Sequence, residues 1–184
     1  MFDKRTLQRI RIPLGFLFAV VFLIFARPSM TSIAVGSGIA FIGLAIRAWA
    51  SGHIRKARVL AVTGPYAYTR NPLYLGTFFL GIGFTVASGV WWLALLFAAL
   101  FIGIYLPVMR VEADDMHRIF GSDFDEYEHS VPVFIPRPAP WKRSHRKKED
   151  EKFEFRLYLQ YREYRAALGA AAAIGVLTAK AYFL

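Results

Sequence analysis

The sequence predicts an all-α fold, a polytopic bundle of about five membrane-spanning helices, from three observations. Apolar residues make up 56% of the 184 residues, and the mean hydropathy is positive, at +0.38. These residues are gathered in long runs with almost no charge, the first of which lies between Arg11 and Arg27. The basic residues that give the net charge of +10 lie mostly outside the apolar runs, before the first run and in the connections after the second and the fourth.

The apolar runs define the expected spans. A helix rises about 1.5 Å per residue, so about twenty residues cross a hydrocarbon core of about 30 Å. We expect spans over residues 12–26, 31–50, 73–88, 90–109 and 166–184. The Ser88-Gly89 turn makes the third and fourth spans a helical hairpin. In the last span Ala167, Ala171 and Gly175 recur at every fourth position, which is typical of close helix packing.

The basic residues predict the orientation. Positive charges concentrate on the cytoplasmic side of membrane proteins. They precede the first span and fill the connections after the second and fourth, whereas the opposite side holds only Arg27 and Lys180. We therefore expect a multi-pass protein of the cell (inner) membrane with a cytoplasmic N-terminus. The cytoplasmic connections account for most of the net positive charge, so no nucleic-acid partner is needed to explain it. The absence of cysteine excludes zinc ribbons, thiol catalysis and iron–sulfur clusters, and the scattered histidines indicate no metal site.

The chain divides into a core, residues 1–141, and a C-terminal part, residues 142–184. The core includes a cytoplasmic segment over residues 110–138. Its first part continues the fourth span as a helix up to Gly121, with a predicted Asp114–Arg118 pair, and its later prolines indicate an extended chain. The C-terminal part contains a charged linker, an interfacial helix over residues 153–165 and the fifth span.

The segment VLAVTGPYAYTRNPLYLG, residues 59–76, has the composition of a site at the mouth of the bundle. Irregular backbone at membrane depth is tolerated only where protein or a water-filled cavity satisfies its polar groups. The helix that begins near Pro72 directs amides toward whatever lies there, which suits a carboxylate or a phosphate. Glu112 lies just past the fourth span. Its carboxylate can bind an ammonium group or the hydroxyls of a ribose, or it can form an ion pair with Arg118 or a loop lysine. Aromatic and cationic side chains crowd the segment: Tyr66, Tyr68, Arg70 and Tyr74.

These residues resemble a known superfamily. The chain resembles the isoprenylcysteine carboxyl methyltransferases and phospholipid methyltransferases over about residues 59–137. The resemblance lies in two motifs on either side of a membrane hairpin, GPYAYTRNPLY before it and E-x7-FG-x2-F-x2-Y-x3-VPVFIPR after it. The resemblance implies an S-adenosyl-L-methionine-dependent enzyme at the cytoplasmic membrane face. Its acceptor would be a lipophilic or prenylated small molecule that offers a carboxylate or an amine, and its partners would include membrane lipids but no nucleic acid or metal.

The resemblance also implies site residues. Arg70 or Arg110 would orient a carboxylate acceptor, and Glu112 or Asp115 would take a proton from an amine. The implied cofactor contacts are Arg58, Val59, Leu60, Ala61, Tyr66, Asn71, Pro72, Leu73, Tyr74 and Glu112.

Three positions depart from the family pattern, and two other functions stay open. Asn71 stands where the family has His, Ala113 replaces the second Glu, and Val108 replaces an Arg that binds the substrate carboxylate. The first two departures favour a non-catalytic scaffold or sensor that retains the cofactor pocket. The other hypothesis is a small transporter or channel component, in which Arg47 within the second span is the functional charge.

Overall fold

The computed structural model describes residues 4–54, 59–142 and 152–183, with side chains from Pro13 onward. Every regular element in these ranges is helical. The elements are α1 (Lys4–Phe25), α2 (Met30–Ser51), the short 3-10 helix η1 (Gly64–Ala67), α3 (Pro72–Ala87), α4 (Trp91–Phe120), α5 (Ser122–Ser130), α6 (Phe155–Gln160) and α7 (Tyr164–Phe183).

The all-α prediction is confirmed. Helices α2, α4 and α7 are long and apolar enough to cross a membrane, and two shorter apolar helices, Pro13–Phe25 and Pro72–Ala87, coincide with the first and third expected spans. Helix α4 runs on to Phe120, and residues 131–142 contain no helix, as predicted. The interfacial helix expected over residues 153–165 is interrupted, because α6 ends at Gln160 and the chain turns before α7.

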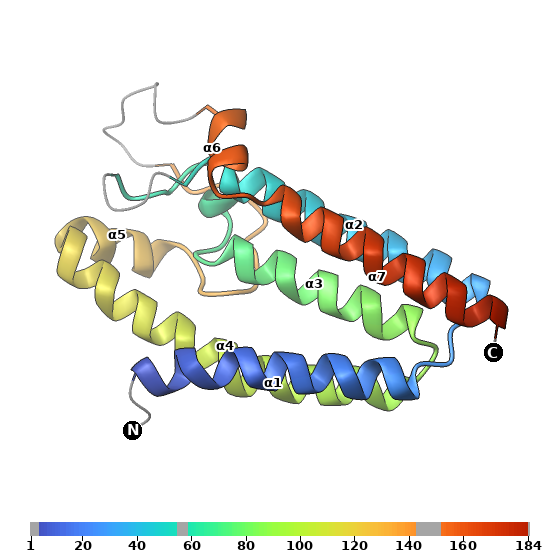
Figure 1. The fold of residues 1–184 in the computed structure, drawn as a ribbon. Coiled ribbons are helices and arrows are strands. Elements are labelled where there is room, and N and C mark those ends of the chain that lie inside the picture. Colours follow the sequence, from blue (N-terminus) through green and yellow to red (C-terminus); the bar gives the residue numbers. More distant parts are fainter. Residues whose placement is uncertain (1–3, 55–58, 143–151, 184) are drawn as a thin grey trace.

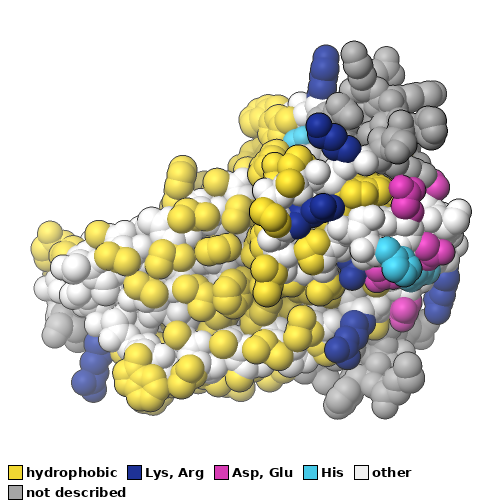
Figure 2. All heavy atoms as spheres, turned by 180° about the vertical axis from the view of Figure 1, so that it is seen from behind, with side chains coloured by type: hydrophobic (Ala, Val, Ile, Leu, Met, Phe, Trp, Pro, Cys, Tyr) yellow, Lys and Arg dark blue, Asp and Glu magenta, His cyan; other side chains and the backbone are white. Residues whose placement is uncertain are grey.

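The long helices run side by side, with their connections gathered at two ends (Figure 1). One end holds the α1–α2 and α3–α4 turns and the C-terminus. The other end holds the N-terminus, η1, α5 and α6. Large apolar side chains face outward along the bundle, such as Phe16, Phe41 and Leu168, at 73%, 70% and 64% exposure. Most of the charged side chains visible in Figure 2 lie at the η1 end, beyond this apolar surface, which is the distribution expected of a membrane protein.

Glycines bring α2 and α3 into close contact. A Cβ atom added to Gly36 would lie 2.4 Å from the carbonyl oxygen of Gly83, and one added to Gly43 would lie 2.6 Å from that of Gly76. Small residues of this kind let two helix backbones approach. The small-residue pattern in α7 had been expected to play this role, and that prediction is wrong, because a Cβ on Gly175 would meet nothing within 4 Å.

The end opposite η1 is closed by short turns. Gly89 adopts a positive φ of +70°, which lets α3 reverse into α4. The amide of Arg27 donates to the carbonyl of Ser88 at 2.7 Å, which joins the two turns at this end. Lys180 of α7 donates to the carbonyl of Leu23 at 2.6 Å, near the end of α1. These contacts leave the η1 end as the place where the chain is irregular.

Candidate active site

Two segments that are distant in the sequence are hydrogen-bonded at the η1 end. The amide of Arg70 donates to the carbonyl of Pro132 at 2.9 Å, and the amide of Arg137 donates to that of Tyr68 at 3.0 Å. The prolines in residues 131–141 keep this segment extended, so its backbone groups remain available to the loop after η1. The two halves of the sequence motif therefore meet in space.

Side chains strengthen this junction. The hydroxyl of Tyr127 on α5 donates to the carbonyl of Tyr66 at 2.7 Å. The side-chain amide of Asn71 donates to the carbonyl of Val133 at 2.9 Å and makes no capping bond to α3. Asn71 therefore helps to hold the extended segment beside the start of the helix.

The junction forms one wall of a cavity of about 610 Å³, at the N-terminal end of α3. This volume lies in the range of small-molecule sites, about 300–1,000 Å³. Arg110 is exposed and outside the lining, and Arg58 lies outside the described residues. The predicted site residues that line the cavity are Val59, Leu60, Ala61, Tyr66, Arg70, Asn71, Pro72, Leu73, Tyr74 and Glu112.

Glu112 and Tyr74 connect α4 to the first turn of α3. The hydroxyl of Tyr74 donates to Oε1 of Glu112 at 2.8 Å. Glu112 itself is exposed, so its carboxylate stands at the open side of the cavity. Arg118, the partner considered for Glu112 and Asp114, instead has its Nη1 3.8 Å from Oδ1 of Asp115.

Two polar atoms of the cavity-lining residues are buried without a partner. The Tyr66 hydroxyl and Nε of Arg70 have no hydrogen-bond partner in the described part of the chain. Burial, reinforced by the nearby Tyr127 and Glu163, raises the pKa of Tyr66 well above its ordinary value of 10.0, so the hydroxyl stays a neutral donor. An unsatisfied buried donor costs about 1–3 kcal/mol, and buried polar groups are normally completed by a partner such as a bound water, an ion or a ligand.

The guanidinium of Arg70 is held by a carboxylate that the sequence analysis missed. Its Nη1 donates to Oε1 of Glu128 on α5, and Nε2 of His117 lies 2.6 Å from the other oxygen of Glu128. Partial burial by itself opposes ionisation of Glu128, but the hydrogen bonds with Arg70 and His117 outweigh it and lower its pKa. No sequence signal pointed to Glu128, because the turn at Gly121 decides which face of α5 meets the loop.

A lowered pKa makes the contribution of Glu128 to stability depend on pH. The contribution is present above its ordinary pKa of 4.5 and is lost as the pH falls through the lower folded-state value. We expect Glu128→Gln to reduce the thermal midpoint at pH 7 by about 2–4 °C, which corresponds to about 1 kcal/mol for a chain of this length. The difference from wild type should shrink below pH 4.5, measured by thermal unfolding in detergent between pH 3.5 and 7.5.

The matched control is Asp114→Asn, which changes an exposed carboxylate on the neighbouring helix α4. It should shift the midpoint by the same small amount at every pH. A Glu128→Gln difference that stayed constant down to pH 3.5 would contradict the assigned role of the Arg70–Glu128 contact.

Further cavity residues come from the helices. Arg47 of α2, Thr77 of α3 and Tyr105 of α4 line it, and the rings of Tyr74 and Tyr105 lie 5.3 Å apart, edge to face. The sequence does mark Arg47 as a candidate site residue, because it is a charged residue inside an apolar run. For Thr77 the sequence signal is its position one helical turn after Leu73, which puts both on the same face of α3. No three His, Cys, Asp or Glu side chains within residues 4–54, 59–142 and 152–183 are grouped so as to hold a metal ion.

These features define a class: a membrane helix bundle with a largely apolar, aromatic-walled cavity of small-molecule size at one end. Residues 14–123 match the family described as phospholipid methyltransferase. This match covers more than half of the chain, and the protein belongs to that family.

Two curated proteins are similar to it. A nickel-cobalt-cadmium resistance protein, NccN, of Alcaligenes xylosoxydans xylosoxydans is 36% identical over 93 residues, which are 50% of this chain and 43% of the relative. A protein-S-isoprenylcysteine O-methyltransferase of Schizosaccharomyces pombe is 23% identical over 137 residues, 72% of this chain and 58% of the relative. The chain thus spans about half the length of these relatives. No solved structure matches it significantly.

Proposed function

We propose that the protein is an S-adenosyl-L-methionine-dependent methyltransferase that acts on a lipid-like or prenylated acceptor at the cytoplasmic face of the membrane. The observation that supports this most directly is the cavity, which collects residues of both motif halves and includes the unsatisfied hydroxyl of Tyr66. In this proposal the η1 end faces the cytoplasm of the cell (inner) membrane, together with the N-terminus and most of the basic residues.

The lining fits the cofactor group by group. S-adenosylmethionine presents an ammonium, a carboxylate, a ribose and an adenine. Glu112 at the open side would bind the ammonium or a ribose hydroxyl. The start of α3 at Pro72 would direct backbone amides toward the carboxylate. The rings of Tyr66, Tyr74 and Tyr105 offer aromatic walls for the adenine, and Tyr66 adds a hydrogen-bond donor.

The chain's own residues would mainly align the reactants. Bound S-adenosylmethionine supplies a methyl group whose carbon–sulfur bond breaks as the bond to the acceptor forms, with the electron pair remaining on sulfur. Such a displacement needs alignment and exclusion of water. A carboxylate acceptor needs only a cation to orient it, whereas an amine acceptor must lose a proton. Among the described residues that line the cavity, Glu112 is the carboxylate that would take this proton.

Cofactor binding tests the proposal. We expect Glu112→Gln to weaken S-adenosylmethionine binding about 10- to 100-fold, because a hydrogen bond to a charged group is worth about 1.5–3 kcal/mol. Tyr74→Phe leaves that carboxylate without its positioning hydroxyl and should weaken binding about 2- to 10-fold. The measurement is calorimetric titration of the detergent-purified protein, followed by transfer of labelled methyl groups to a lipid extract.

Arg110→Gln is the control, since Arg110 is exposed outside the lining, and it should bind the cofactor as wild type does. Absence of binding by folded wild-type protein, repeated in lipid nanodiscs, would refute the proposal.

A non-catalytic scaffold or sensor that retains the pocket is the alternative. It is favoured by Asn71, whose amide is already donated to Val133 where the family has a histidine. Cofactor binding without methyl transfer to any component of the lipid extract would support this alternative.

A further inference from the structure

The C-terminal part contributes a charge that binds a residue of the cavity wall. Glu163, in the turn between α6 and α7, reaches Arg47 on α2. Nε of Arg47 donates to Oε2 of Glu163 at 3.0 Å, and Nη2 donates to Oε1 at 2.9 Å. The remaining Nη1 donates to the hydroxyl of Thr77 at 2.6 Å. The guanidinium is thus bound by a carboxylate in the two-pronged manner that favours arginine over lysine.

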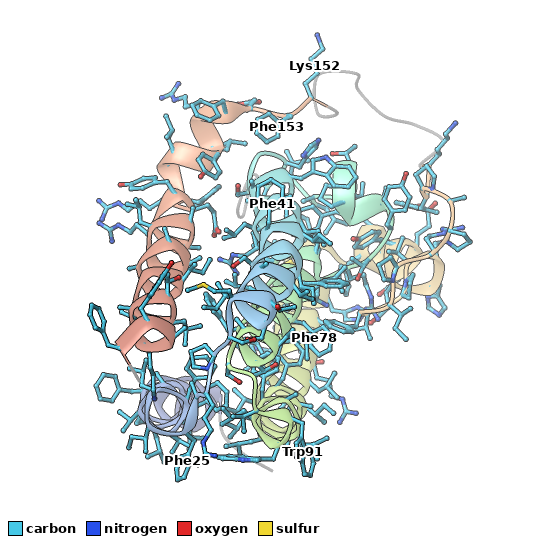
Figure 3. The ribbon with its side chains drawn as sticks, turned by 90° about the vertical axis from the view of Figure 1, so that its right-hand side faces the viewer. Phe25, Phe41, Phe78, Trp91, Lys152 and Phe153 are labelled. Atoms are coloured by element: carbon cyan, nitrogen blue, oxygen red, sulfur yellow. The ribbon has the colours of Figure 1, made fainter. Side chains whose placement is uncertain are left out.

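Arg47 separates two spaces. On one side is the 610 Å³ cavity, and on the other is a space of about 200 Å³ between α2 and the α6–α7 segment. Helix α7 runs beside α2 in both ribbon views, and Figure 3 labels Phe41 on α2. Apart from Arg47 and Glu163, the smaller space is lined by Phe41, Leu44, Ala45, Ala48, Tyr158 and Ala167. An apolar chain that enters here from the bilayer would reach the Arg47–Glu163 pair and, beyond it, the cavity.

The other two candidate cations do not border both spaces. Arg110 lies outside the lining of the larger cavity, and Arg70 lines that cavity but not the smaller apolar space. Arg47 is therefore the arginine that borders both the cavity and an apolar space.

A purely structural role for the pair is the competing explanation. Removing two charges from water is costly, and apolar residues of similar size often replace such a pair without loss of stability. Charged residues within membrane-spanning helices commonly mark substrate paths. Here the carboxylate of Glu163 has the same chemistry as the head group of one of the two proposed acceptor classes.

We propose that Arg47 binds the carboxylate head group of an amphiphilic acceptor, and that Glu163 occupies Arg47 until that head group replaces it. The acceptor's apolar tail then lies in the space between α2 and α7. This inference rests on the proposed function, because it assigns the acceptor side of the same site. It also gives the C-terminal part a role: α6 and α7 carry the carboxylate that the acceptor displaces.

The test compares a charged probe with a neutral one, in phosphatidylcholine nanodiscs and without S-adenosylmethionine. Binding of tritiated palmitate and of tritiated hexadecanol is measured by scintillation proximity. Glu163→Gln should bind palmitate about 10-fold more tightly than wild type, because the competing carboxylate is gone. Arg47→Gln should bind it about 10-fold more weakly. Hexadecanol should bind with the same affinity to wild type, Glu163→Gln and Arg47→Gln. The control Arg165→Gln should bind both probes as tightly as wild type does.

The opposite signs separate the two explanations. If the pair only holds α7 against α2, both substitutions would weaken palmitate and hexadecanol alike, and the proposal is overturned. If Arg47→Gln does not fold with Glu163 unpaired, the double variant Arg47→Gln/Glu163→Gln replaces it and should bind palmitate about 10-fold more weakly than wild type. Palmitate binding by this double variant at the strength of Glu163→Gln would equally overturn the proposal.

The cofactor titration keeps this inference distinct from the proposed function. The palmitate pattern can hold in a protein that binds no S-adenosylmethionine, in which case only the methyltransferase assignment fails. Conversely, cofactor binding with an unchanged palmitate affinity in Glu163→Gln overturns the acceptor subsite alone.

Discussion

Gly36→Ala is expected to destabilise the bundle by about 3 kcal/mol and to lower its thermal midpoint by about 6–12 °C. The added Cβ would lie 2.4 Å from the carbonyl oxygen of Gly83 and 2.5 Å from the amide nitrogen of Ala87. Both are backbone atoms of the α3 segment, so no side-chain rotation relieves the contact, and the two helices must separate. Thermal unfolding of the detergent-solubilised protein, followed by size-exclusion chromatography, measures the shift.

Gly38→Ala on the same helix is the matched control. Its Cβ would meet nothing within 4 Å. Alanine is favoured over glycine within a helix by about 1 kcal/mol, so this variant should unfold at or above the wild-type temperature. Equal shifts for the two variants would contradict the close approach of α2 and α3.

Tyr66→Phe is expected to change stability and cofactor binding in opposite directions. In the free protein the Tyr66 hydroxyl is buried without a partner in the described part of the chain. Its removal should therefore raise the thermal midpoint by about 2–8 °C, which corresponds to about 1–2 kcal/mol. S-adenosylmethionine should bind about 10-fold more weakly, because the phenylalanine variant cannot donate a hydrogen bond to it.

Tyr68→Phe serves as the comparison, because Tyr68 is half-buried on the same loop but outside the cavity lining. Its affinity for the cofactor should equal that of wild type. A lower midpoint for Tyr66→Phe would show that its hydroxyl is satisfied within the protein, and an unchanged affinity would remove it from the cofactor site.

The sequence by itself determined the long apolar helices, because a helix of a membrane protein is a local property, whereas α5 was not predicted. Apolar runs of sufficient length predicted the positions of α1 to α4 and α7, the glycine at position 121 predicted the end of α4, and four prolines predicted the extended segment after α5. The motif GPYAYTRNPLY and Glu112 likewise identified part of the cavity wall, namely Tyr66, Arg70, Asn71, Pro72, Leu73, Tyr74 and Glu112. These residues flank a single hairpin, so the turn between α3 and α4 brings them to the same end of the bundle.

Only the tertiary structure decided which surfaces meet. Repeated small residues occur in both α2 and α7, yet the close backbone contact forms at Gly36 and Gly43 of α2, where α3 offers glycines in register. The partners of the two lining arginines were also hidden. Glu163 lies 116 residues from Arg47, and Glu128 lies 58 residues from Arg70. An ion pair depends on distances of about 3 Å between side chains, and chain segments this far apart reach such distances only after the helices have packed.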